Sequence, residues 1–161
     1  MPFRLRRDAR SWFSHLERGF GKGDTGPAAP LFDMYYLCLM AGLAAGEPLS
    51  DLTVADTSEL VDNFPGEYRE RGRLIIAFFL SRELRQLGVK LTERDALHST
   101  ISRLVDPNSS SWLSDEGMRR MNQYAHGGFD VLVARFDDKP RHIETFLPMY
   151  AEIIRTAQDD A

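Results

Sequence analysis

Apolar residues recur at helical spacing along most of this chain and predict its main elements. In residues 8–20, one side of a helix collects Ala9, Trp12, Phe13, Leu16 and Phe20. Residues 31–45 are apolar nearly all round, which is typical of a helix at the centre of a domain. Residues 67–87 begin with charged side chains and continue through the apolar run "LIIAFFL". We expect a helix there and not a β-strand, because Leu84 and Leu87 continue the 3.6-residue period beyond that run.

Capping residues and helix breakers mark where the next helices begin and end. Gly88 is expected to end the third helix. Thr92, followed three residues later by Asp95, opens another helix in a pattern close to a capping box. After the loop "DPNSSS", Ser114 is expected to cap a further helix.

Two parts of the chain are less regular. Between residues 47 and 66, Ser50 and Asp56 are candidate caps of short helices. A last helix is expected over residues 141–156, where Pro148 requires a kink or a later start.

The stretch "NQYAHGGFDVLVARF" places two glycines between two helical patterns. The second pattern has apolar residues at i, i+3, i+4 and i+7, namely Phe129, Leu132, Val133 and Phe136. A glycine pair commonly supplies the positive φ angles that let a chain turn. We therefore predict that Gly127 and Gly128 form a structural corner between two helices. Such a corner is expected to bring Tyr124 and His126 to the surface, as a contact for an anion or a partner.

These patterns predict an all-α protein, a compact single-domain bundle of about six or seven helices around a central apolar helix. The single domain spans residues 1–161. Within it we expect a basic amphipathic N-terminal helix in residues 1–22, a Gly/Pro linker in residues 21–30, and the core in residues 31–161.

Composition narrows the class of protein. The chain is 43% hydrophobic and 27% charged, as ordinary globular proteins are. Its net charge of −4 argues against a surface that binds nucleic acid over its whole extent, although residues 1–22 carry +4 and the remainder −8.

The single cysteine, Cys38, excludes an internal disulfide, fits a reducing compartment, and is expected in the core. The apolar run around it is shorter than the roughly 20 residues of a membrane span, and residues 1–13 lack the pattern of a secretory signal. We therefore expect a cytoplasmic protein without a membrane segment.

Arginine is the basic residue that dominates, with seventeen arginines against three lysines. Planar guanidinium groups favour bidentate pairing with carboxylates or phosphates. Two interpretations stay open: salt bridges with the acidic excess, or docking onto a phosphate backbone or an acidic partner. The N-terminal helix likewise either packs on the domain or reaches out to a partner or nucleic acid, with binding to a membrane surface as the weakest option. The candidate contact residues are Arg6, Arg7, Arg10, Arg69, Arg71, Arg73, Arg119, Arg120, Tyr124 and His126.

Motifs for catalysis are weak. "GKGDTG" satisfies G-x-G-x-x-G at Gly21, Gly23 and Gly26, but a helix precedes it and prolines follow, so we interpret it as a linker. The four histidines show no metal-ligand spacing. Asp95 and His98, at i and i+3, are the one acid–imidazole pair, and the same spacing is common on solvated helix faces. No cofactor, metal or enzymatic activity is expected.

Two stretches, "LFDMYYLCLMAGLAAGEPL" and "NQYAHGGFDVL", resemble small helical accessory proteins found with bacterial phage-defence and DNA phosphorothioation gene clusters. That family has an apolar helix ending in glycine and a later Y-A-x-G-G-[LF] segment. The matching positions here are Gly42 or Gly46, Tyr124, Ala125, Gly127, Gly128 and Phe129. His126 departs from the pattern, which has a small polar residue such as Asn. The resemblance covers about a fifth of the chain and implies a non-enzymatic subunit beside a DNA-modifying or DNA-cleaving complex.

We therefore expect a bacterial accessory subunit of a DNA-targeting defence complex, which binds other protein subunits and reaches DNA through phosphate contacts. The alternative is a stand-alone helical DNA-binding protein or transcriptional regulator. Its nearest helix-turn-helix candidate, "LTERDALHSTISRLV" after "LSRELRQLG", lacks a recognition helix rich in base-reading residues.

Overall fold

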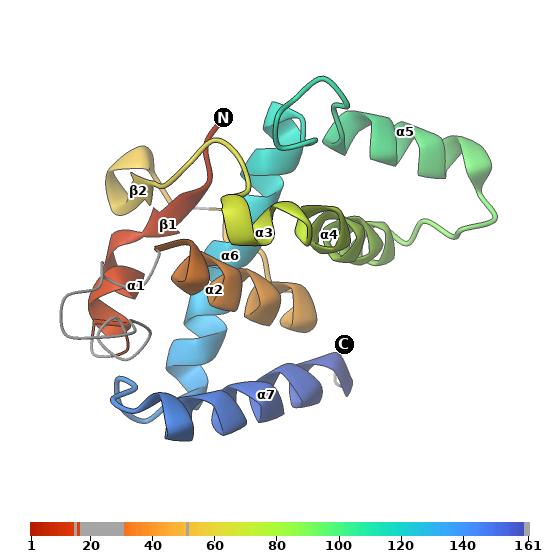
Figure 1. Cartoon of the computed structure of the whole chain (residues 1–161). Helices are drawn as coiled ribbons and strands as arrows, with labels where there is room; N and C mark the ends of the chain where they lie inside the picture. The colour runs from red at the N-terminus through yellow and green to blue at the C-terminus, as the bar shows by residue number, and fades with distance from the viewer. Residues whose placement is uncertain (15, 17–30, 51, 160–161) are drawn as a thin grey trace.

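The computed structural model describes residues 1–14, 16, 31–50 and 52–159. In these ranges the chain forms seven α-helices, one short 3-10 helix and a two-stranded antiparallel sheet, which confirms the all-α class (Figure 1). The elements in chain order are β1 (Arg4–Arg6), α1 (Arg7–Trp12), α2 (Leu31–Ala45), η1 (Val54–Asp56), β2 (Thr57–Glu59), α3 (Gly66–Arg69), α4 (Gly72–Gln86), α5 (Arg94–Leu104), α6 (Asp115–Arg135) and α7 (Ile143–Asp159).

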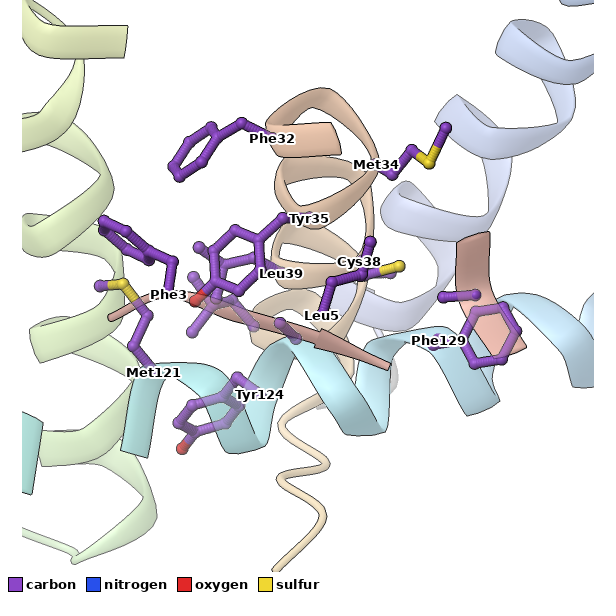
Figure 2. Packing of buried hydrophobic residues seen from close by; sticks show 14 of the residues in the cluster. Phe3, Leu5, Phe32, Met34, Tyr35, Cys38, Leu39, Met121, Tyr124 and Phe129 are labelled. Atoms are coloured by element: carbon purple, nitrogen blue, oxygen red, sulfur yellow. The ribbon is translucent and has the colours of Figure 1, made fainter. Parts of the chain in front are cut away.

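The central helix is α2, as its apolar sequence predicted. It crosses α6 in the middle of the molecule and packs against α7 on another side (Figure 1). Tyr35, Cys38 and Leu39 of α2 are buried between α6 and the N-terminal segment (Figure 2). Phe3 fills the same core, with its ring centroid 5.3 Å from that of Tyr35 in an edge-to-face arrangement. The predicted core position of Cys38 is thus confirmed.

The predicted corner at Gly127 and Gly128 is wrong, because α6 continues through both glycines without interruption. Both glycines lie instead where the backbone of α6 comes close to the backbone of α2 and of the residues that follow α2. A Cβ on Gly128 would lie 1.8 Å from the carbonyl oxygen of Cys38, and one on Gly127 would lie 1.7 Å from that of Glu47. On the facing helix, a Cβ on Gly42 would lie 1.9 Å from the carbonyl oxygen of Tyr124. The glycines therefore permit a close helix crossing and not a turn.

The N-terminal segment also differs from the prediction. Residues 4–6 form a strand that pairs with residues 57–59, with Arg4 opposite Glu59, and α1 follows directly from residue 7 to residue 12. The later part of the predicted first helix, the 21–30 linker and the G-x-G-x-x-G motif lie outside the described residues.

The helix predicted over residues 67–87 is divided into α3 and α4. The division falls at residues 70 and 71, and α4 begins at Gly72, whose missing side chain leaves room for the Phe64 ring: a Cβ there would lie 2.8 Å from Phe64 Cδ2. The run "LIIAFFL" is helical as predicted. The last helix runs from Ile143 to Asp159 and holds Pro148 in its second turn.

Gly88 ends α4 as predicted, with φ of +68°. The N-terminal caps agree with the sequence at one position and differ at two. Ser114 caps α6, since its Oγ accepts from the Gly117 N–H at 3.0 Å. The capping box at η1 is formed by Thr53, with Asp56 as its acidic partner and not as the cap. Helix α5 begins after Glu93, one residue beyond the predicted cap at Thr92. Among the described helices, none combines the length and apolar character needed to cross a bilayer.

Candidate functional site

Tyr124, predicted at the surface, is fully buried in a polar network inside the bundle. Its hydroxyl donates to Glu83 of α4, whose side chain is itself buried, and Arg120 Nε donates to the same carboxylate oxygen at 2.9 Å. Burial and the neighbouring carboxylate raise the pKa of Tyr124. The network joins α4 to α6, so Tyr124 is buried inside the fold and is not available as a partner contact, whereas Arg120 stays partly exposed while it pairs with Glu83.

His126 is also buried, with 6% of its surface exposed. Its Nε2 lies 3.2 Å from the carbonyl oxygen of Arg4 in β1. Burial lowers the pKa of His126 to about 4, against the opposing effect of the hydrogen bond to Arg4. The imidazole is therefore neutral near neutral pH, and it packs the N-terminal strand onto α6.

This burial predicts a loss of stability in mild acid. The folded-state pKa of about 4 lies below the ordinary value of 6.5, so the unfolded chain binds the proton first as the pH falls. The contribution is fully present above pH 6.5, and we expect up to about 3 kcal/mol of unfolding free energy to be lost between pH 6.5 and 4. Urea unfolding of the parent and of H126Q across this range measures it: the parent should lose more stability than H126Q. As a control, H98Q at an exposed histidine should follow the parent, and an H126Q curve parallel to the parent's would contradict the prediction.

Arg6 is neutralised by two carboxylates. It forms ion pairs with Asp8 and with Asp130 of α6, and its guanidinium lies over the Phe129 ring at 4.9 Å. Its pKa is raised by the Asp8 and Asp130 carboxylates, which outweigh the opposing and largest single effect, desolvation by burial. Of the two roles that the sequence left open for the arginines, Arg6 has the first: it forms salt bridges within the protein.

The remaining predicted arginines are exposed, but they do not share one surface. Arg7 and Arg10 lie on α1, and Arg119 lies on α6 beside a hollow of about 240 Å³ that also contains Arg4. Arg71 lies between α3 and α4. Three pairs of predicted residues lie together: Arg120 and Tyr124 in the network with Glu83, Arg119 and His126 beside the same hollow, and Arg69 and Arg73 near Trp112.

Arg69 and Arg73 meet at a hollow of about 200 Å³ between the start of α4 and the loop before α6. The hollow is lined by Asn63, Phe64, Arg69, Ser110 and Trp112. The guanidinium of Arg73 lies over the Trp112 ring, 5.3 Å from its centroid. Among the described residues, no carboxylate lies within ion-pair distance of Arg69 or Arg73. We name this cluster the arginine–tryptophan hollow.

Trp112 is the residue that sequence reasoning missed. Its backbone has φ of +59°, a left-handed conformation that is costly for a bulky side chain. Hydrogen bonds hold it there: Trp112 N–H donates to the Ser109 carbonyl, and the Trp112 carbonyl accepts from the Asp106 N–H. The signal in the sequence is a tryptophan that ends the polar loop "DPNSSS". Strain of this kind is often found at functional positions.

The alternative catalytic pair is not assembled. Asp95 and His98 both lie exposed on α5, and no hydrogen bond joins them within the described ranges. Among all the residues that the structure describes, no group of three or more histidine, cysteine or carboxylate side chains is arranged to hold a metal ion.

Comparison of the chain with protein-family models, curated proteins and solved structures finds no match.

Proposed function

We propose that this protein is a non-enzymatic accessory subunit that contacts the phosphate backbone of DNA through Arg69 and Arg73. The observation that supports this is the arginine–tryptophan hollow, where two arginines without a carboxylate partner in the described chain flank a strained, partly exposed aromatic ring. An arginine stacked on a ring keeps its N–H groups directed outward for bidentate binding to an oxyanion.

Single-stranded DNA suits this hollow better than a duplex. Proteins that bind single strands combine positive charge along the backbone with aromatic rings on which bases stack. Trp112 lies next to both arginines, so one nucleotide can place its phosphate on the guanidinium groups and its base against the indole. Because the whole chain carries −4, we expect binding to be local, weak and independent of sequence.

Membership of a phage-defence complex is supported only by the resemblance noted in the sequence. The residues that carry this resemblance, Gly42 and residues 124–129, lie at the crossing of α2 and α6. They would specify a shared helix packing, so the resemblance supports a common fold more directly than a common partner. The accessory role in such a complex is the proposal that follows from it.

The regulator alternative is less well supported. A helix-turn-helix joins its two helices by a turn of about 3–4 residues, whereas residues 87–93 separate α4 from α5. We therefore keep the accessory role as the proposal.

Fluorescence anisotropy with a labelled oligo(dT) strand at low salt tests the DNA contact. We expect the double substitution Arg69→Gln and Arg73→Gln to weaken binding at least tenfold, and to reduce the slope of log affinity against log salt by up to about 1.4. The matched control is Arg71→Gln, an exposed arginine in the same segment that has no aromatic partner, and it should bind nearly as the parent does.

Tryptophan fluorescence provides a second readout of the same site. In a Trp12→Phe background, Trp112 is the only tryptophan, and stacking of a base should quench its emission as oligo(dT) is added. Two outcomes would overturn the proposal: no binding at low salt, or equal losses from the double variant and from Arg71→Gln.

A further inference from the structure

A third hollow is lined by residues of α4, of α7 and of the C-terminal half of α2, three helices whose arrangement Figure 1 shows. Its volume is about 370 Å³. Met40, Leu43 and Ala44 of α2 line it together with Phe78, Ser81, Arg82 and Arg85 of α4 and Gln158 of α7. One part of the lining is therefore apolar and the other is cationic. We name it the α4 groove.

Arg82 is positioned against the end of α2. Gly46, with φ of +70°, closes α2, and a Cβ on it would lie 1.6 Å from Arg82 Nη2. Gln86 Nε2 donates to the Gly46 carbonyl at 3.3 Å. The Nε of Arg82 is buried and has no hydrogen-bond partner, which is costly for a charged group. Arg82 thus lines the groove while its Nε is without a hydrogen-bond partner.

Arg85 adds a second positive charge to the groove. It is exposed and lies one turn beyond Arg82 on α4. No carboxylate of the described chain lies within ion-pair distance of either arginine. The charge of this end of the groove is complementary to a carboxylate that the described chain does not supply.

The apolar side of the groove continues along α4. Phe78 is 47% exposed, and Leu74, one turn earlier on the same helix face, is 56% exposed. Leu74, Phe78 and Arg85 share one face at i, i+4 and i+11, so the surface extends beyond the hollow itself. An elongated apolar stripe ending in positive charge fits a helical segment better than a small molecule, which needs an enclosing pocket.

We infer that the α4 groove is a docking site for an acidic amphipathic helix of a partner protein. Apolar side chains of that helix lie against Leu74, Phe78 and Met40, and its carboxylates pair with Arg82 and Arg85, in the helix-in-groove mode of recognition. A nucleic-acid backbone fits poorly, because the residues that α2 contributes to the lining, Met40, Leu43 and Ala44, are all apolar. The inference rests on the accessory role proposed above and names the surface that serves it.

The experiment uses the full chain and a fluorescein-labelled, helix-forming peptide. The peptide carries leucines at i, i+4 and i+7 and two glutamates one turn further on, and a matched peptide carries lysines in place of the glutamates. We expect the acidic peptide to bind and the lysine peptide to bind at least tenfold more weakly. Phe78→Ser and Arg85→Glu change exposed residues, so they should leave the fold intact and each weaken the acidic peptide at least tenfold. Arg94→Glu, on α5 and outside the groove, is the control and should bind as the parent does.

Three outcomes would overturn the inference. They are equal binding of the two peptides, no effect of either groove substitution, and concentration-dependent dimerisation that Phe78→Ser abolishes, which would make a second copy of the chain the occupant. Arg69 and Arg73 are not among the residues lining the groove, so the R69Q/R73Q variant should retain the acidic peptide. If the parent binds the acidic peptide but not oligo(dT), the DNA proposal has failed; if it binds oligo(dT) but not the acidic peptide, the groove inference has failed.

Discussion

Replacing Gly128 with alanine is expected to lower the free energy of unfolding by about 3 kcal/mol, at the upper end of the usual cost of overpacking. The new Cβ would lie 1.8 Å from the Cys38 carbonyl oxygen and 2.4 Å from the Gly42 nitrogen. Both are backbone atoms of α2, which cannot move aside as a flexible side chain can. The helices must separate, although alanine gains about 1 kcal/mol over glycine in helix propensity.

Urea unfolding followed by circular dichroism measures this loss. Gly66→Ala is the matched control, because a Cβ on Gly66 at the start of α3 would meet no atom within 4 Å. The control should change stability by no more than about 1 kcal/mol. If G128A and G66A unfolded at the same urea concentration, the close crossing of α2 and α6 would not be a constraint on the fold.

The positions of the main helices could be predicted because their signals are local. The apolar run of α2 and the Ser114 cap of α6 each depend on residues within a few positions of one another. The all-α class follows from such signals. Helix ends were less well predicted: residues 70 and 71 interrupt a helix that the apolar pattern predicted as continuous.

The role of the glycine pair could not be read from its neighbours in sequence. A glycine that turns the chain and a glycine that admits another helix look alike locally. The difference lies in Cys38 and Gly42 of α2, more than eighty residues earlier in the chain. The resemblance of both stretches to one family pattern was consistent with their contact, but it did not specify that contact.

The arginines show the same limit. Arg6 pairs with Asp130, 124 positions away, and Arg120 pairs with Glu83, 37 positions away. Only the fold decides which guanidinium groups are neutralised inside the molecule. The sequence identified Arg69 and Arg73 as candidates, but their separation from Arg71 and their contact with Trp112 required the structure.

Removing the carboxylate of Glu83 is the second substitution with a large expected effect. Glu83 is 2% exposed and accepts from both Tyr124 and Arg120. Glu83→Ala leaves the Tyr124 hydroxyl buried without a partner and Arg120 without its counter-ion. Breaking a buried ion pair from one side commonly costs about 3–5 kcal/mol. Because Arg120 retains partial exposure and can reach water, we expect about 3 kcal/mol, at the lower end of that range.

Two further variants show whether burial is the cause of this loss. Tyr124→Phe removes one neutral donor and should cost about 1 kcal/mol. Glu152→Ala breaks the Glu152–Arg155 pair, whose side chains are both more than 60% exposed, and should leave the unfolding free energy nearly unchanged, because water screens an exposed pair. Urea unfolding of the three variants should therefore rank Glu83→Ala far below the other two. The network fixes α4 to α6, so Glu83→Ala should also weaken binding of the acidic peptide to the α4 groove. Equal stability of the E83A and E152A variants would mean that α4 is held by its apolar face alone.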